Sequence, residues 1–282
     1  MASAQLPHTI ERAQMLLLLR LMDRQPWLKK VEDALLDAFD YCDTVDQQNL
    51  VADLLLRTEY LSETCFTASI REMGRQVEDG WKLDPKKTWF VSSNHKENTD
   101  SSQEVLNRLK SFEWSSADWD RRRFLTRYRE VVDKTTKGDT VVIVDDFVGT
   151  GRSMTKTVDW FRNKSANDDL DLELRVCVVA SCQVGLSALE GLGVDTFSVR
   201  QIPKSISDYF GGQDLNNALD AMNALEDKLQ DQSEKKLDDY RLGYGASEAM
   251  YHRVGGNTPN NVFPFFWWRY VSSGRRTVMH RT

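Results

Sequence analysis

The chain has 282 residues, of which 40% are hydrophobic and 28% charged, so it contains enough apolar material for a folded core and is not disordered throughout. Its 37 Lys and Arg residues and 43 Asp and Glu residues give a formal net charge of -6 at pH 7, which excludes a broad positive surface for nucleic acid. The four cysteines lack the CxxC and Cys/His spacings of zinc sites, and Arg20 ends the apolar run at residues 15–19 well short of the ~20 residues that span a bilayer. We therefore expect a cytoplasmic protein with reduced thiols and no membrane contact.

Residues 9–81 have the periodicity of helices. Leu28, Val31 and Leu35 recur at three- and four-residue spacing, which predicts a bundle of about four helices within an N-terminal region at residues 1–84. Thr44 and Ser62 precede apolar-periodic stretches and carry side-chain oxygens that can cap helix starts. Leucine-rich stripes of this kind usually pack against other helices, so we assign them no chemistry.

An α/β region is predicted at residues 85–282, after the break at residues 84–87. The predicted strands are residues 88–92, 140–144, 174–181 and 195–202, and the predicted helices are residues 105–112, 121–133, 153–163 and 184–192. Strands that alternate with helices at this spacing form βαβ units with right-handed crossovers, so the fold class is α/β with a mainly parallel sheet.

The remaining sequence divides into an acidic segment and an aromatic tail. Residues 215–236 read as a charged helix with a solvated face. The tail from residue 242 contains NTPNNVFPFFWWRY, whose prolines, asparagines and aromatics suit neither a helix nor a regular strand.

One segment carries a binding motif, VVIVDDFVGTGRS at residues 141–153. Four β-branched residues make a buried strand, and Asp145 and Asp146 follow at its carboxyl end, the edge at which open α/β sheets bind ligands. The next residues turn into a helix, so backbone amides and hydroxyls converge at a positive helix N-terminus that suits a phosphate. Two carboxylates beside such a turn can hold the hydroxyls of a ribose while the turn holds its phosphate.

Two other interpretations fit part of this motif. A Walker B strand has the same apolar-then-acidic pattern, but the chain contains no GxxxxGK[ST] segment to hold a nucleoside triphosphate. An ordinary strand-to-helix turn with incidental carboxylates is the second alternative.

The segment resembles the signature of the type I phosphoribosyltransferases, and every specified position of that signature is met. The resemblance implies their fold, assigns the ribose hydroxyls to Asp145 and Asp146 as the catalytic pair, and assigns the 5′-phosphate to a loop. That loop comprises Gly149, Thr150, Gly151, Arg152 and Ser153. Gly149 departs from the family, because purine enzymes of the family have an aspartate there that acts as a base, and this puts a standard purine-salvage reaction in doubt.

The family also needs a diphosphate loop and a hood over the base. The best candidate for the diphosphate loop follows the strand at residues 88–92 and comprises Ser93, Asn94, His95 and Lys96. Arg121, Arg122 and Arg123 could clamp a diphosphate, although a charge run at a helix start is usually solvated.

The order of the whole chain resembles a branch of this superfamily found in bacterial conflict and antiphage systems, because LGYG and NTPNN segments occur near its end. In that tail, Tyr244 or Trp267 could stack on a base while Asn260 or Asn261 reads its polar edge. The alternative is a structural strap whose aromatics fill the core.

These resemblances imply a Mg²⁺-dependent enzyme that acts at the anomeric carbon of 5-phosphoribosyl diphosphate or a nucleotide, with the ion held through the ligand and not directly by the protein. The rival hypothesis is a catalytically degenerate module that senses a nucleotide and signals to a partner. A third is an antiphage effector that depletes nucleotides and is restrained by a partner protein from the same locus.

Overall fold

The computed structural model describes residues 12–93, 101–229, 236–270 and 274–281. Its centre is a five-stranded sheet in the order β3-β2-β4-β5-β6, in which every neighbouring pair is parallel. The strands are β2 (Thr88–Ser92), β3 (Phe124–Leu125), β4 (Thr140–Val148), β5 (Glu173–Cys182) and β6 (Asp195–Ile202). This arrangement confirms the predicted α/β class with a mainly parallel sheet.

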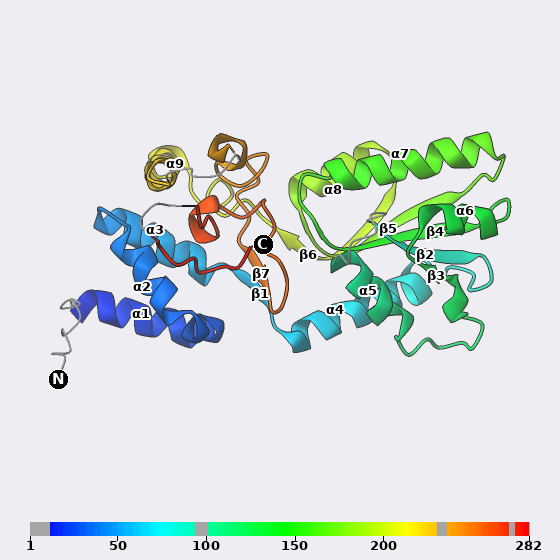
Figure 1. Ribbon diagram of the computed structural model, residues 1–282, viewed down its shortest axis with the longest axis horizontal. Helices are drawn as coiled ribbons and strands as arrows, with labels where there is room; N and C mark the ends of the chain where they lie inside the picture. Colours follow the sequence, from blue (N-terminus) through cyan, green and yellow to red (C-terminus); the bar gives the residue numbers. More distant parts are fainter. Residues whose placement is uncertain (1–11, 94–100, 230–235, 271–273, 282) are drawn as a thin grey trace.

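Helices cover both faces of the sheet (Figure 1). One face carries α6 (Tyr128–Lys134), α7 (Arg152–Asn167) and α8 (Gln183–Gly191), and the other carries α4 (Glu63–Arg75) and α5 (Ser101–Lys110). Alternate residues of β4 explain the two layers, since Val141 and Ile143 belong to one core cluster and Val142 and Val144 to the other. A strand that is buried on both faces requires the continuous apolar run seen in its sequence.

The predicted strand at residues 140–144 is too short, because β4 continues through the acid pair to Val148. Asp145 still lies opposite Val178, and Phe147 lies opposite Ala180 on β5. The carboxylates are therefore positioned by a rigid strand and not by a loop.

The predicted helix at residues 121–133 is confirmed only over residues 128–133, and its first part is wrong. A short 3-10 turn (Arg121–Arg123) leads into the edge strand β3, and the helix α6 begins only at Tyr128. Phe124 stacks on Phe90 of β2 with ring centroids 4.2 Å apart, so a tertiary contact holds this segment as a strand against its local helical pattern.

A second group of elements lies beside the sheet (Figure 1). It contains α1 (Arg12–Arg24), a 3-10 helix (Pro26–Lys30), α2 (Glu32–Asp40), α3 (Val45–Leu56), α9 (Gly212–Asp227) and the C-terminal segment with short 3-10 helices at Leu237–Tyr240 and Pro264–Phe266. Thr44 and Ser62 cap α3 and α4 as predicted, by accepting hydrogen bonds from the backbone amides of Gln47 and Cys65.

Each of these two groups contains elements from before and from after the predicted boundary at residue 84. The helix α4 continues into a π-helical turn (Gln76–Gly80) and contacts β5 and β6 of the main sheet. The strand β1 (Glu59–Leu61) pairs with β7 (Tyr251–Arg253) to join the N-terminal and C-terminal segments. The division into two regions at that residue stays a prediction.

The helix α9 buries Ala218, Met222, Leu225 and also Glu226, so only part of the acidic segment is a solvated face. Over the described ranges, no helix combines the length and the apolar character that crossing a membrane requires.

Candidate functional site

A cavity of about 650 Å³ opens at the carboxyl end of β4, where the sequence predicts the ligand site. One side is built from consecutive residues of β4 and the following turn and helix, residues 145–154 and 156, which we call the strand wall. The opposite side comes from the C-terminal segment, Tyr244, residues 257–261 and Arg281, which we call the tail wall. Ser93 and Ser101 complete the lining beside the acid pair.

The turn of the strand wall is shaped by Gly151. This residue has φ 77° and immediately precedes the first residue of α7. A Cβ added to it would lie 3.1 Å from both Gly185 O and Ala188 Cβ, so a larger residue would be strained in its backbone and crowded by α8. The turn thus directs the N-terminus of α7 toward the cavity, with Arg152 and Lys156 supplying positive charge at the same end.

The acid pair lies at the other end of the strand wall, where Asp145 is partly buried and Asp146 is only 9% exposed. Asp145 accepts hydrogen bonds from Ser93 Oγ and from the backbone amide of Asp146, and Asp146 accepts one of 2.8 Å from Ser101 Oγ. Ser93 is itself fixed, because its amide continues the β2–β4 ladder by donating to Val144 O at 2.9 Å. Both carboxylates are therefore held in a defined orientation.

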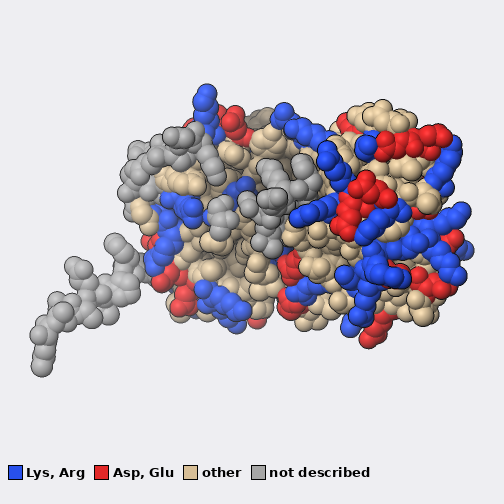
Figure 2. All heavy atoms as spheres, turned by 45° about the vertical axis from the view of Figure 1, so that its right-hand side comes forward, with Lys and Arg blue, Asp and Glu red and all other residues tan. Residues whose placement is uncertain are grey.

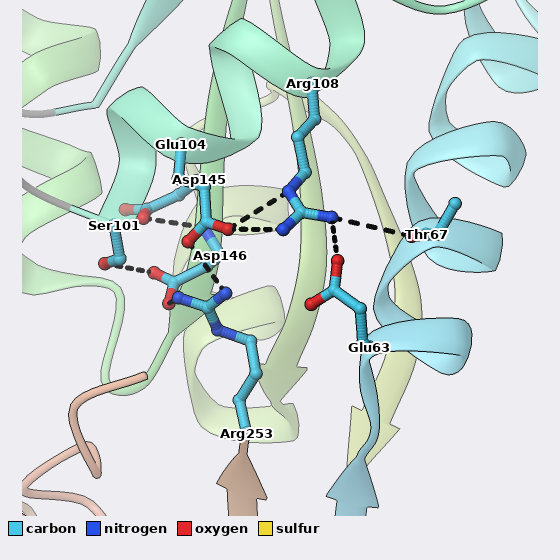
Figure 3. A network of polar contacts seen from close by, with 8 residues as sticks. All are labelled: Glu63, Thr67, Ser101, Glu104, Arg108, Asp145, Asp146 and Arg253. Atoms are coloured by element: carbon cyan, nitrogen blue, oxygen red, sulfur yellow. Dashed lines mark hydrogen bonds and ion pairs between the residues drawn. The ribbon is translucent and has the colours of Figure 1, made fainter. Parts of the chain in front are cut away.

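An ion-pair network joins Asp146 to segments far away in the sequence (Figure 3). Arg253 of β7 places Nη2 3.8 Å from Asp146 Oδ2 and donates from Nη1 to Glu104 Oε2 at 2.9 Å. Glu104 of α5 also accepts a 3.0 Å hydrogen bond from Arg108 Nε, and Arg108 pairs with Glu63 at the start of α4. The network thus connects one carboxylate of the pair on β4 with three other elements, β7, α5 and α4.

Burial and charge compete within this network. Burial alone would raise the pKa of Glu104, but hydrogen bonds from Arg253 and Arg108 lower the pKa overall. Tyr251 stacks on Phe147 at 4.9 Å, and its burial, followed by the nearby charge of Asp146, raises its pKa far above the ordinary value. The tyrosine stays neutral, so the charges beside the acid pair come from the arginines and carboxylates.

The structure brings three of the four predicted base-side residues, Tyr244, Asn260 and Asn261, into the cavity lining. The Tyr244 amide donates to Asn260 O at 2.8 Å, which ties the LGYG and NTPNN segments together. The Tyr244 hydroxyl accepts a 3.1 Å hydrogen bond from Arg152 Nη1, so the tail wall contacts the phosphate end of the strand wall.

Trp267 is the exception, and the prediction that it stacks on a base in the cavity is wrong. Its side chain is 3% exposed, packs in the hydrophobic core, and donates from Nε1 to Val262 O at 2.8 Å. Arg281 lies over its ring at 4.9 Å, and it is Arg281, not Trp267, that lines the cavity. Trp267 therefore behaves as the core-filling strap that was the alternative interpretation of the tail.

The predicted diphosphate loop is described only at its first residue. Ser93 lines the cavity, whereas Asn94, His95 and Lys96 lie outside the described residues.

The arginine run at residues 121–123 does not contribute to the cavity lining. Figure 2 shows that Lys and Arg side chains gather over the right-hand part of the molecule, intermixed with acidic ones. Within the run, Arg122 pairs with Asp120 at 2.6 Å and Arg123 lies over the Trp89 ring at 4.5 Å. Arg122 is exposed, as expected for a solvated charge run.

Several residues of the site were missed by the sequence reasoning. They are Ser101, Glu104, Lys156, Arg253, Asn257, Thr258 and Arg281. Lys156 could have been found, because it lies one helical turn after Arg152 on the predicted helix. Arg253 had no comparable local signal, since only the pairing of β7 with β1 brings it to the acid pair.

A parallel α/β sheet whose central strand ends in an acid pair and a Thr-Gly turn defines a type I phosphoribosyltransferase-like protein. The model of the PRTase-CE family matches residues 27–276. The chain belongs to that family.

Among solved structures, the chain is similar to the orotate phosphoribosyltransferase of Aeropyrum pernix, with 16% identity over 57% of this chain and 77% of that one and a TM-score of 0.33. It is similar to that of Mycobacterium tuberculosis in complex with inorganic phosphate, with 20% identity over 49% and 71% and a TM-score of 0.34. The xanthine-guanine-hypoxanthine phosphoribosyltransferase of Helicobacter pylori shares 11% identity over 51% and 84%, with a TM-score of 0.32. Likenesses this distant say nothing about the substrate. No curated protein matches the chain.

Proposed function

We propose that this cavity binds 5-phosphoribosyl diphosphate or a nucleotide. The observation that carries the proposal is that a single cavity has the acid pair at one end of a continuous wall and the N-terminus of α7 at the other. The carboxylates of Asp145 and Asp146 would accept hydrogen bonds from the ribose hydroxyls, and the turn from Gly149 to Ser153 would hold the 5′-phosphate. Family membership supports the same ligand class.

The proposed reaction takes place at the anomeric carbon, either as transfer of the phosphoribosyl group to an acceptor or as cleavage of a nucleotide. Positive charge develops on the sugar ring as the leaving group departs, so a protein mainly needs to fix the ribose and stabilise that charge. Held carboxylates below the ring would serve both purposes, which is why we propose Asp145 and Asp146 as the catalytic pair.

Mg²⁺ would join this site through the ligand. Within the described ranges, no group of three or more His, Cys, Asp or Glu side chains could hold a metal ion. A Mg²⁺ ion that takes its ligands from a diphosphate, a ribose and waters needs no such group, because Mg²⁺ usually keeps several waters and binds substrate phosphates. Asp145 and Asp146 would act on the ion only through the ribose hydroxyls that they hold.

Thermal unfolding with and without ligand tests the proposal. We expect 5-phosphoribosyl diphosphate with Mg²⁺ to raise the Tm, and Asp145→Asn and Asp146→Asn each to weaken binding at least tenfold, because a hydrogen bond to a charged group contributes ~1.5–3 kcal/mol. Asp159→Asn on the exposed face of α7 is the matched control and should bind as the unsubstituted protein does. If both acid-pair variants kept full affinity, the proposed site would be wrong.

A nucleotide-sensing module is a second candidate, and one observation favours it. The place of the aspartate that serves as base in the resembling purine enzymes is held by Gly149, and the neutral Asn261 lies over it. A site without a base can still bind a nucleotide. Release of diphosphate or free base from labelled ligands distinguishes the two, since an enzyme turns over and a sensor shows only ligand-dependent stabilisation.

We further propose a role as a bacterial antiphage effector that acts with a partner protein from the same locus in the cytoplasm. The support is the resemblance of the LGYG and NTPNN segments to the conflict-associated branch. A locus that contains only salvage or biosynthetic genes would contradict this role, and phage challenge of cells that express the acid-pair variants would test it directly.

A further inference from the structure

Gly149 of the strand wall and Asn261 of the tail wall lie close against each other. A Cβ built on Gly149 would lie 1.9 Å from Asn261 Oδ1 and 2.3 Å from Asn261 Cγ, which no side chain can occupy. The volume that a side chain at position 149 would need is therefore filled by an amide from the tail. The Asn261 amide thus takes the place that a side chain at position 149 of the strand wall would occupy.

The Asn261 amide is fixed in one orientation by its hydrogen bonds. Nδ2 donates to Tyr244 O and to Ser247 Oγ, both at 3.1 Å, which uses both of its hydrogens. The backbone is fixed as well, because Asn261 O accepts from the Ala249 amide at 3.1 Å and from Ser247 Oγ at 3.0 Å. The side chain is 5% exposed, so it has little freedom to turn.

This orientation leaves one polar atom of the amide for a ligand. Within the described ranges, Oδ1 has no hydrogen bond, and Asn261 lines the cavity. Oδ1 accepts hydrogen bonds and does not donate them, and a neutral amide does not take up a proton near neutral pH. The tail wall therefore offers a fixed, uncharged acceptor at this point.

A ribose phosphate held by the strand wall as proposed would direct its remaining substituent toward this acceptor. The hydroxyls on C2 and C3 and the phosphate on C5 are accounted for by the acid pair and the turn, so the group on C1 faces the rest of the cavity. The tail wall provides that part of the lining, with Asn261 above Gly149 between the two ends of the strand wall.

We propose that Asn261 Oδ1 is a specificity-determining acceptor that selects bases carrying an exocyclic amino group. This inference rests on the proposed function and names its ligand more narrowly. Oδ1 can accept a hydrogen bond from an exocyclic amino group placed opposite it. A carbonyl group at the same point would set two acceptors against each other, and Nδ2 cannot turn to donate because it is already used by Tyr244 and Ser247.

Two ligand pairs test the inference in the unsubstituted protein. AMP is compared with purine riboside 5′-monophosphate, and CMP with zebularine 5′-monophosphate, because each second member lacks only the amino group. We expect calorimetry to show at least tenfold weaker binding for the second member of one pair. Equal affinity within twofold in both pairs, with 5-phosphoribosyl diphosphate still bound, would overturn the inference and leave the proposed function standing.

Substitutions then assign the preference to the residue. Asn261→Leu keeps the side-chain shape without the acceptor and should abolish the preference while the affinity for 5-phosphoribosyl diphosphate changes less than threefold. Asn163→Ala, at an exposed asparagine of α7 that does not line the cavity, is the matched control and should retain the preference. A preference that persists in Asn261→Leu would overturn the inference. If Asn261→Leu does not fold, the ligand pairs decide alone, and if neither 5-phosphoribosyl diphosphate nor any nucleotide binds, the proposed function fails together with the inference.

Discussion

The two walls of the cavity are built in different ways. The strand wall is a single run of sequence, in which a buried strand, two carboxylates, a glycine with positive φ and a helix start follow one another. The tail wall is assembled from Tyr244, residues 257–261 and Arg281, which have little regular secondary structure. The elements proposed to hold ribose and phosphate are thus encoded locally, whereas the opposite side of the cavity depends on how the C-terminal segment folds back.

The walls also differ in what holds them in place. Hydrogen bonds of the parallel sheet fix the strand wall, while the tail wall depends on close contacts such as Gly245, whose added Cβ would lie 2.6 Å from Thr150 Cγ2. The position of the tail wall therefore depends on small residues where it meets the strand wall.

The largest effect is expected from breaking the ion-pair network that joins Asp146 of the strand wall to β7 and α5. Arg253→Met would leave Asp146 and the partly exposed Glu104 without their shared arginine, and the loss of this buried arginine should cost about 2–3 kcal/mol, less than for a fully buried ion pair. Chemical denaturation should show this loss, together with weakened binding of 5-phosphoribosyl diphosphate. Arg276→Met, which removes an exposed arginine paired with Asp33 and Asp37, is the matched control and should change stability little. An Arg253 variant as stable as that control would show that the network around Asp146 does not stabilise the fold.

The direct contact between the walls gives the next effect. Gly149→Ala forces a methyl group into Asn261 and should destabilise the fold by about 2 kcal/mol, as overpacking does. Gly191→Ala, where an added Cβ meets nothing within 4 Å, is the control and should be neutral or stabilising. The double variant with Asn261→Gly should be markedly more stable than the sum of the single effects, because the clash is gone. Additive effects would contradict the close contact.

The difference between the walls also explains what the sequence could predict. Residues 88–92 and 195–202 match β2 and β6 to the residue. The first is a short buried apolar run and the second alternates apolar and polar side chains around Phe197 and Val199, and both patterns are local signals. The end of β4 could not be placed, since DDFV lacks that apolar character and is held as a strand by β5. The helix predicted at residues 121–133 failed for a related reason, because Phe124 stacks on a residue of another strand.

The same division applies to the site. Asp145, Asp146 and the turn were predictable, because their chemistry follows from thirteen consecutive residues. In the tail, Tyr244, Asn260 and Asn261 reach the cavity, but nothing local separates them from Trp267, which the core buries. Arg253 and Arg281 were out of reach, since each depends on a contact between distant segments.

As the pH is lowered, the tail wall should lose stability at a higher pH than the strand wall. Burial, together with the charges of His280 and Arg253, lowers the pKa of His252 from 6.5 to about 4, and its Nδ1 lies 3.2 Å from Thr258 Oγ1 in the cavity lining. Below pH 6.5 the unfolded chain binds a proton that the folded chain does not, so this stability is full above that pH and is lost as the pH falls toward 4. The expected loss at pH 5 is about 2 kcal/mol.

The free energy of unfolding, measured between pH 7 and 4.5, checks this expectation. His252→Phe should flatten the dependence in this range, whereas His280→Phe, at an exposed position, should leave most of it. A profile that is identical in the His252 variant and the unsubstituted protein would assign the acid sensitivity to other groups.

The smallest effect concerns the hydrogen bond between Tyr244 and Arg152, which joins the tail wall to the phosphate end. Because this bond is exposed, Tyr244→Phe should cost only about 0.5 kcal/mol. Arg152 also lines the cavity, so its release should change the affinity for ribose 5-phosphate by threefold or less. Tyr209→Phe, at an exposed tyrosine away from the cavity, is the control for loss of a hydroxyl. A much larger loss of ribose 5-phosphate binding in Tyr244→Phe would mean that the tail wall takes part in holding the phosphate. The proposed assignment of phosphate binding to the strand wall alone would then be wrong.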